Sequence, residues 1–340
     1  MRVTACVVSW NDAAHLGPAL DSLARQTHPD LEIVVIDNAS ADDSAAVARS
    51  RPDVRLIANR SNLGYSGAAN QAVGIARDEH ASQALLLCNP DVRLEPDYVS
   101  AAVAALAGDS RRAAVQGRLW RTETDRAGHK ILDTTGHLAF STRLFRNRGE
   151  GQIDAGQFSA VEEIFGVSGA LALYRVAALD DAACAGEVFD ADLFAFWEDV
   201  DLDWRLQLRG WQAWYEPQAR AWHQRGGAGP RRTAVVERLN FANRFLVIAK
   251  NDDPVALARA LPGVTVTSVL KAGELAVTVP SAFLGSFAHA RLLPAALRKR
   301  RLIQSRAAVD PASVIQRWFR PFDYGLWART WWLRVRGPRG

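Results

Sequence analysis

The sequence predicts an α/β fold built on a mostly parallel sheet. Short apolar runs alternate with segments in which apolar residues recur at helical spacing, which is the pattern of strand–helix–strand units. Each apolar run also stops at a polar cluster, the second at Asp37-Asn38-Ala39-Ser40 and the fourth at Asn89-Pro90-Asp91. A chain of 340 residues with 49% hydrophobic residues can bury a substantial core, and we expect it to divide into two parts.

Seven elements follow in order from this alternation. The run Val-Thr-Ala-Cys-Val-Val predicts the first strand, and the spacing of Leu16, Leu20 and Leu23 predicts the helix after it. The strands are expected at residues 3–8, 31–36, 54–58 and 84–88, and the helices at residues 13–25, 42–49 and 64–76. Farther along the chain, residues 220–222 predict another strand.

The carboxyl ends of these strands predict a shared binding edge. Ligands of parallel sheets bind beyond that edge, so we expect Ser9, Asn11 and Asp37 to face a nucleotide there. No GxGxxG follows the first strand and no GxxxxGK[ST] occurs, which argues against a dinucleotide or P-loop site. The carboxylate of Asp37 can accept the imide N–H of uracil or thymine. An ordinary strand-end turn is the alternative.

Asp91 is a candidate metal ligand at the same edge. Pro90 stiffens the turn and fixes the direction of the next side chain. Mg²⁺ and Mn²⁺ prefer oxygen ligands and keep substrate phosphates in their shell, so a strand-end aspartate suits a cation that bridges a diphosphate. An Asn-Pro-Asp turn that holds no metal is the alternative interpretation.

Residues 189–205 combine six carboxylates with aromatic side chains. Leu202, Trp204 and Leu206 predict a helix with a buried stripe, and Glu198 and Asp199 then fall at its N-terminus, where the helix dipole favours anions. Aromatic walls partly desolvate a carboxylate, which raises its pKa toward the range of a general base. The alternative is a capped, solvated helix start.

Six motifs occur in an order that is highly specific in combination. They are Val-Val-Ser-Trp-Asn (7–11), Val-Ile-Asp-Asn-Ala-Ser (35–40), Asn-Leu-Gly-Tyr-Ser-Gly-Ala-Ala-Asn (62–70), Asn-Pro-Asp-Val (89–92), Gly-Val-Ser-Gly-Ala (166–170) and the Glu-Asp-Val-Asp-Leu run (198–202). Together they resemble glycosyltransferase family 2, which has the GT-A fold, and most of all its bacterial rhamnosyltransferase-like branch. The resemblance covers about residues 1–225.

The resemblance implies a role for several residues on the donor side. Asp37 matches the aspartate that reads the base, and Asn62, Gly64 and Asn70 match a loop and helix near the sugar diphosphate. Asn89 stands where many members carry an aspartate, so one potential charge on the metal is missing. Asn89 is therefore expected to contact the nucleotide sugar.

The resemblance also implies the metal ligands and the base. Asp91 matches the last acid of the Asp-x-Asp metal motif, and His223 matches a histidine that joins the metal or diphosphate shell in several relatives. A satisfied structural histidine is the alternative for His223. Asp199 matches the catalytic base, with Glu198 beside it.

The Gly-Val-Ser-Gly-Ala motif has two interpretations. Ser168 and Gly169 are expected to line the acceptor pocket, because glycine allows close backbone approach. A tight packing turn is the alternative.

The function implied is an inverting, metal-dependent transfer from a nucleotide-diphosphate sugar. Rhamnose from dTDP-rhamnose is the first candidate donor, and a lipid-linked or glycan acceptor in cell-surface polysaccharide synthesis is expected. Another hexosyl or galactofuranosyl transferase of the same family is one alternative, and a non-catalytic scaffold that binds a sugar nucleotide is another. The chain carries Gln316-Arg317-Trp318 without the Gln-x-x-Arg-Trp spacing of processive members, so we expect few sugars per acceptor.

Charge divides the chain into a front domain, residues 1–225, and a basic C-terminal region, residues 226–340. In the front domain, residues 1–100 are the expected nucleotide-sugar half and residues 101–225 the acceptor half. Residues 225–340 hold 20 Lys and Arg against 6 Asp and Glu, a net charge of +14, whereas residues 1–224 have a net charge of −10.

The C-terminal region is expected to form helices that lie on an anionic membrane surface or in a homo-oligomer interface. Arginines alternate there with aromatic residues, among them Trp318, Trp327, Trp331 and Trp332, which suits a bilayer interface. The longest uncharged run, Leu275 to Ala290, has 16 residues and is short for a spanning helix.

No nucleic-acid recognition motif accompanies the basic charge, so no nucleic-acid partner is expected. A plain helical domain with a solvated basic face is the alternative. The chain starts directly with a strand, without a signal peptide. We therefore expect a cytoplasmic protein, peripheral on the inner face of the plasma membrane.

Overall fold

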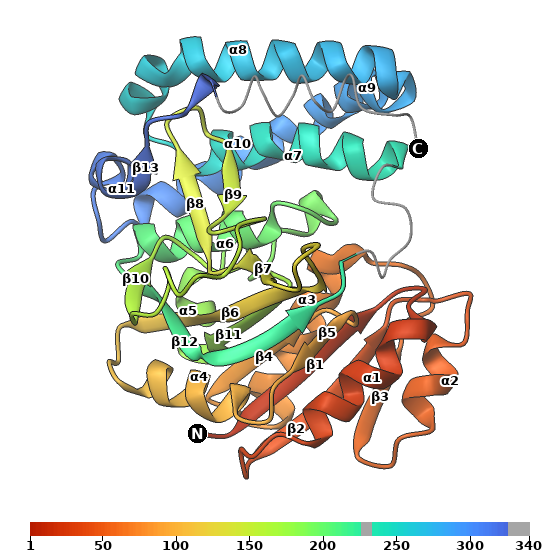
Figure 1. Ribbon diagram of the computed structural model, residues 1–340. Coiled ribbons are helices and arrows are strands. Elements are labelled where there is room, and N and C mark those ends of the chain that lie inside the picture. Colours follow the sequence, from red (N-terminus) through yellow and green to blue (C-terminus); the bar gives the residue numbers. More distant parts are fainter. Residues whose placement is uncertain (226–232, 326–340) are drawn as a thin grey trace.

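The computed structural model describes residues 1–225 and 233–325, and a mixed sheet forms its centre (Figure 1). Its strands are β1 (Val3–Ser9), β2 (Leu31–Asp37), β3 (Val54–Ala58), β4 (Ala84–Cys88), β5 (Val92–Leu94), β6 (Arg112–Thr124), β7 (Lys130–Thr134), β10 (Glu162–Ile164), β11 (Leu171–Arg175) and β12 (Gln212–His223). The strand order is β10-β12-β6-β11-β4-β1-β2-β3, with β5 beside β12 and β7 beside β6.

The N-terminal half has the predicted alternation. Strands β1 to β4 pair in parallel, which confirms the expected α/β fold. The helices of the front domain are α1 (Ala13–Ala24), α2 (Ser44–Arg49), α3 (Gly64–Gly74), α4 (Tyr98–Ala107), α5 (Val176–Ala182) and α6 (Glu198–Leu208). Helix α3 ends earlier than its apolar spacing predicts, because the chain passes into a π-helical turn at Ile75–Glu79.

The second half of the sheet departs from the parallel pattern. Strand β11 runs antiparallel to both β4 and β6, whereas β12 runs parallel to β6. The strand predicted at residues 220–222 is the end of the longer β12. Its pairing with β6 shifts register between Glu216 and Arg220, so no continuous alternation marks the whole strand in the sequence.

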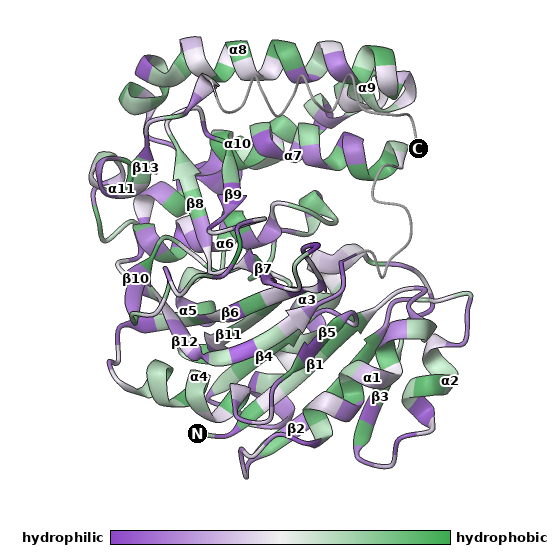
Figure 2. Cartoon of the chain, viewed as in Figure 1, coloured by the Kyte–Doolittle hydropathy of each residue, from purple (hydrophilic) through white to green (hydrophobic). Residues whose placement is uncertain are grey.

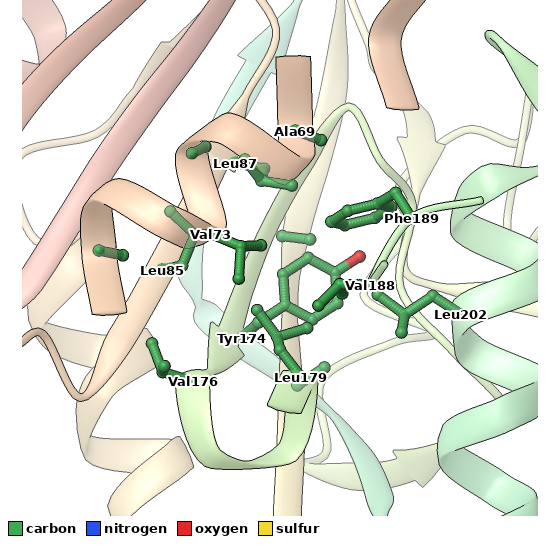
Figure 3. Close-up of a cluster of buried hydrophobic side chains, with 14 of the residues drawn as sticks. Ala69, Val73, Leu85, Leu87, Tyr174, Val176, Leu179, Val188, Phe189 and Leu202 are labelled. Atoms are coloured by element: carbon green, nitrogen blue, oxygen red, sulfur yellow. The ribbon is translucent and has the colours of Figure 1, made fainter. Parts of the chain in front are cut away.

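Buried side chains fill both faces of the sheet. On one face Ala69 and Val73 of α3 pack with Leu85 and Leu87 of β4 and with Tyr174 of β11 (Figure 3). On the other face α1 and α4 cover the alternate residues of β1 and β4, as the two-residue period of a strand requires. The sheet is therefore a rigid base for the side chains at its carboxyl-end edge.

The C-terminal region is helical, as expected, and packs on α6. Its helices are α7 (Ala234–Asn251), α8 (Pro254–Thr278), α9 (Pro280–Ser286), α10 (Leu293–Ser305) and α11 (Pro311–Trp318). They lie beyond α6, away from strands β1 to β3 (Figure 1). One buried cluster joins Trp204 and Leu208 of α6 to Val247 of α7 and Ile303 of α10. The C-terminal helices and the front domain therefore share a core.

A short second sheet adds to this contact. Strand β13 (Phe319–Arg320) pairs in parallel with β8 (His137–Phe140), which pairs with β9 (Phe145–Asn147). The predicted helical region thus also contributes a strand. Phe319 packs on Phe145 and Trp204 with ring centroids 5.7 and 5.0 Å apart. This sheet holds the chain after α11 against the front domain.

Buried ion pairs lock α7 and α10 to the chain around α6. Lys250 of α7 lies 2.9 Å from the Asp201 carboxylate and also contacts Asp190. Asn251 donates to the same Asp201 side chain at 2.8 Å. Lys299 of α10 lies 2.5 Å from Asp190, so this member of the basic cluster at residues 298–301 faces inward.

Helix α8 is mostly exposed. It is long and apolar enough to cross a membrane by length and composition, and within the described residues no other helix meets both conditions. A single such helix is a weak indication of a membrane location. Val269 and Val277 are 63% and 82% exposed, and hydrophobic residues recur along α8 and α9 (Figure 2).

The apolar run expected from Leu275 to Ala290 divides between the end of α8, helix α9 and a 3₁₀ segment, Phe287–Leu292. The chain turns at Pro280, which cannot continue the ladder of α8. Trp327, Trp331 and Trp332, expected at a bilayer interface, lie outside the described residues.

Candidate active site

A cavity of about 700 Å³ lies at the carboxyl-end edge of the parallel strands. It is bounded by the ends of β1, β2 and β4, by the turn at residues 168–170, by the loop before α6, and by the first turns of α7. The cavity brings together most of the residues expected from the sequence, namely Asn62, Gly64, Asn89, Asp91, Ser168, Gly169, Glu198, Asp199 and His223.

Four expected residues lie outside the lining of this cavity. Ser9 and Asp37 are register partners at the ends of β1 and β2, and both are buried. Their Oγ and Oδ1 atoms have no hydrogen-bond partner among the described residues. Asn11 accepts from the Ala41 amide at 2.8 Å, and Asn70 donates to the Phe189 carbonyl at 2.7 Å. These two side chains hold backbone turns.

One end of the cavity carries the expected metal ligands. His223 Nε2 lies 3.3 Å from Asp91 Oδ1, and His223 Nδ1 lies 2.7 Å from Asp133 Oδ2. Burial lowers the pKa of His223, but the hydrogen bonds with Asp133 and Asp91 outweigh it and raise that pKa to about 9. In the structure His223 therefore bridges two carboxylates.

This arrangement fits a divalent cation bound together with a substrate. A metal-binding histidine usually directs its other ring nitrogen at a carboxylate, which is the relation of His223 to Asp133. Asp12 lines the same end, where burial and next the charge of Asp91 raise its pKa to about 7. Within residues 1–225 and 233–325 no three His, Cys, Asp or Glu side chains form a metal-binding group. Substrate phosphates would have to complete the shell.

Asp199 also lines the cavity, in the first turn of α6. The backbone N–H of Gly169 donates to its Oδ2 at 2.9 Å, and that of Val200 donates to its Oδ1 at 2.8 Å. Tyr65 donates in turn to the Gly169 carbonyl at 3.1 Å. The Asp199 side chain is 19% exposed, so it is held in a fixed orientation and still reaches the cavity.

Glu198 is in a different environment from its neighbour. It is buried, and its Oε2 has no hydrogen-bond partner among the described residues. Burial, and next the charge of Asp199, raise the pKa of Glu198 to about 8. At neutral pH Glu198 is therefore a neutral carboxylic acid, and it stands next to the second acidic residue of the helix start, Asp199.

The loop before α6 is strained. Phe194, Phe196 and Trp197 all have positive φ, at 63°, 68° and 74°, although aromatic residues seldom adopt this conformation. Such strain persists where the surrounding structure imposes it, commonly at functional sites. Gly64 permits the close approach, because a Cβ there would lie 2.3 Å from the Phe194 carbonyl oxygen.

Helix α7 supplies the contacts that hold this loop. The Asn243 side-chain amide donates to the carbonyls of Leu193, Ala195 and Phe196 at 2.8, 3.0 and 2.9 Å. Trp197 Nε1 donates to the Asn240 carbonyl at 3.0 Å. The C-terminal region thus shapes the active site itself.

Sequence reasoning missed several residues of the site. Asp12 directly follows the first motif, and its position just after a predicted strand could have identified it as a site residue. Asn243, Arg225 and His137 carry no periodic or motif signal, because each reaches the cavity or its loop through a contact distant in sequence. Trp10, at the end of the first strand, is exposed and also lines the cavity.

The sheet topology and the cavity define a GT-A glycosyltransferase, and comparison with known proteins supports the family. The model of the family described as glycosyl transferase family 2 matches residues 4–182. The chain therefore belongs to glycosyl transferase family 2 and is a glycosyltransferase.

The individual proteins to which this chain is similar are also glycosyltransferases. An N-acetylglucosaminyl-diphospho-decaprenol L-rhamnosyltransferase of Mycobacterium tuberculosis is 28% identical over 235 residues, which cover 64% of this chain and 74% of the relative. A mannosyltransferase from Pyrobaculum calidifontis, solved with GDP-Man and Mn²⁺, is similar in fold with a TM-score of 0.52 at 20% identity, covering 93% of this chain and 87% of its own. GalNAc-T7, solved with UDP, GalNAc and Mn²⁺, has a TM-score of 0.56 at 12% identity, covering 74% of this chain and 48% of its own.

Replacing Asn243 by alanine is expected to lower kcat/KM about 10²-fold without loss of folding. The substitution removes the donors that hold the strained loop, and a displacement of about 1 Å near a reacting group costs a factor of this order. Steady-state kinetics, with a melting curve for each protein, measures the effect. Gln304→Ala, which removes a carboxamide that donates to the Asn251 carbonyl on α7, is the matched control. Equal kinetics for the two variants would contradict the role of Asn243.

Proposed function

We propose that this protein is an inverting glycosyltransferase that moves a sugar from a nucleotide-diphosphate donor to a lipid-linked or glycan acceptor. The observation that carries the proposal is one cavity lined both by an oriented aspartate, Asp199, and by the Asp91–His223 pair. The printed name of the mycobacterial relative, a rhamnosyltransferase acting on a decaprenol-linked sugar, supports rhamnose from dTDP-rhamnose as the first donor to test.

Asp199 would act as the general base. The acceptor hydroxyl is a poor nucleophile until its proton is removed, and Asp199 takes that proton as the hydroxyl oxygen bonds to the anomeric carbon. The bond from that carbon to the diphosphate oxygen breaks, and the electron pair leaves with the diphosphate. Attack opposite the leaving group inverts the anomeric centre. Positioned base catalysis is worth roughly 10²–10⁴ in rate.

Asp91 and His223 would hold Mg²⁺ or Mn²⁺ at the diphosphate. Such a cation acts as a Lewis acid that neutralises the charge gained by the leaving group. Asp133 orients the His223 ring from behind, at 2.7 Å. A cation at Nε2 would displace the proton that His223 directs at Asp91, because a ring nitrogen must be deprotonated to bind a metal, whereas the Nδ1 proton directed at Asp133 would remain.

Ser9 and Asp37 would recognise the nucleotide base. The two residues are register partners at the ends of β1 and β2, and the Ser9 Oγ and Asp37 Oδ1 atoms are buried without a partner among the described residues, although buried polar atoms in folded proteins normally have one. A pyrimidine imide N–H donating to the Asp37 carboxylate would supply one. Asn89, Asn62 and Gly64 line the cavity, where they would contact the sugar diphosphate.

The exposed surface of α8 and α9 would dock on the inner face of the plasma membrane. Val269 and Val277 of α8, and Phe287 directly after α9, are more than half exposed. Arg298 and Arg301 of α10 are exposed and add positive charge that favours anionic lipid. A lipid-linked acceptor would then be delivered at the surface on which the enzyme sits. A second copy of the chain is the other occupant that this surface could take.

Asp199→Asn is expected to lower turnover at least about 10²-fold while donor affinity stays within about twofold, because asparagine keeps the shape but cannot accept the proton. Radiolabelled transfer and donor titration measure the two quantities. Asp192→Asn, a half-exposed carboxylate in the same acidic run, is the control. Unchanged turnover in Asp199→Asn would remove this residue as the base.

Asp91→Ala is expected to abolish the stabilisation that Mn²⁺ and a nucleoside diphosphate produce together. A bound ligand at 100 times its Kd raises the stability by about 2.7 kcal/mol, which a thermal-shift titration detects. Asp97→Ala, an aspartate just before α4, should behave as wild type. A metal response that survives in Asp91→Ala would contradict the assignment of this ligand.

Val269→Asp combined with Val277→Asp is expected to release the protein from vesicles that contain anionic lipid, because a charge in the apolar face opposes burial in the bilayer interface. Cosedimentation with vesicles measures binding. Val161→Asp, at an exposed site of the front domain, is the matched control. The surface is not a membrane-docking face if the double variant pellets as wild type does, or if wild type stays in solution and forms dimers.

A further inference from the structure

Asp199 and Asp203 face the same side of α6. They stand four residues apart, which places two side chains on one helix face. The histidine that opens β8, His137, lies between them: its Nδ1 is 2.8 Å from Asp203 Oδ2 and its Nε2 is 3.6 Å from Asp199 Oδ2. His137 is 6% exposed and Asp203 is fully buried.

The turn at residues 166–170 is shaped around this row of side chains. A Cβ at Gly166 would lie 1.9 Å from Asp203 Oδ2, so no larger residue fits there while Asp203 keeps its place. The Gly166 carbonyl accepts from the His137 backbone N–H at 2.9 Å, and Val167 N donates to Asp203 Oδ1 at 3.2 Å. Backbone contacts of this turn therefore fix both His137 and Asp203.

The geometry favours a positively charged imidazole ring. Nδ1 forms a hydrogen bond with Asp203 Oδ2, and Nε2 lies 3.6 Å from Asp199 Oδ2, which is beyond hydrogen-bond distance but close enough for the carboxylate charge to favour the protonated ring. Burial lowers the pKa of His137, but the charge of Asp199 and the hydrogen bond to Asp203 outweigh it, so the pKa lies above its usual value. Burial raises the pKa of Asp203 to about 6 despite the histidine, so Asp203 is ionised at neutral pH.

We propose that His137, anchored by Asp203, is a positioning residue that holds the Asp199 carboxylate in its orientation and places a positive charge beside it until the acceptor binds. The inference rests on the proposed role of Asp199 as the base. His137 and the Gly169 N–H both act on Asp199 Oδ2, while Oδ1 accepts one hydrogen bond from the part of the chain that the structure describes, that from Val200 N. A carboxylate oxygen can accept two, so Oδ1 keeps a site for the proton of the acceptor.

Other ionisable groups also face Asp199. Glu198 precedes it on α6, and Tyr65 of α3 and Tyr174 of β11 lie close enough for the Asp199 charge to act on them. Burial raises the pKa of both tyrosines well above the usual value, so both are neutral at neutral pH. Glu198 is neutral at neutral pH, so His137 is the cation among the groups named here.

The test is the pH dependence of kcat/KM in His137→Gln, with His80→Gln as the control because His80 is another largely buried histidine remote from this cavity. Loss of a cation 3.6 Å away should move the acidic limb to higher pH by about one unit or more. Donor KM should stay within about twofold. A purely structural role would lower activity equally at every pH, and an unmoved limb in folded His137→Gln would overturn the inference.

A second measurement does not depend on the folding of that variant. If the His137 cation favours ionised Asp199, the Asp199 charge must equally raise the His137 midpoint. Imidazole titration by NMR in wild type and Asp199→Asn should then show one histidine midpoint fall by about one unit or more. Identical titrations would overturn the inference. Transfer activity retained in Asp199→Asn would overturn the proposed function instead, so the two failures are distinguishable.

Discussion

The burial of an acidic helix is the constraint on which this structure depends. Helix α6 carries Glu198, Asp199, Asp201 and Asp203, and all but Asp199 are buried. Burying a charge costs free energy unless an opposite charge or hydrogen bonds stabilise it, so each of these buried carboxylates needs a partner or a proton. Lys250 and Arg205 pair with Asp201, His137 pairs with Asp203, and Glu198 is protonated at neutral pH. Because Lys250 belongs to α7, the C-terminal helices are part of this compensation.

The C-terminal region therefore has two faces with different tasks. Its inner face holds the strained loop before α6 through Asn243, closes one side of the cavity with α7 and pairs with the acidic run through Lys250. Its outer face leaves α8 and α9 exposed and apolar (Figure 2). Deleting the whole region would therefore not test membrane docking by itself. Loss of the inner contacts would disturb the active site, whatever the outer surface binds. Single substitutions on the outer face separate the two tasks.

The sequence predicted the parts of the fold and site that depend on local patterns. The spacing of apolar residues and the polar clusters that end each apolar run predicted β1 to β4. The leucine stripe of α6 predicted that this helix starts at Glu198. The Gly-Val-Ser-Gly-Ala motif predicted a close backbone approach, although not that Gly166 makes room for Asp203. His137 lies 66 residues from Asp203, and Asn243 lies about 50 residues from the loop that it holds. Such contacts arise only when the sheet and the C-terminal helices assemble, so no local pattern predicts them.

The central claim is a single displacement in which Asp199 activates an acceptor while the diphosphate leaves from the Asp91–His223 end. The most direct measurement is proton NMR of the first sugar released when water replaces the acceptor, using the nucleotide sugar that binds in a thermal-shift panel. The anomeric proton of the initial product reports its configuration before mutarotation. The account predicts inversion relative to the donor. Retention would contradict it, because retention requires a second displacement or a covalent intermediate.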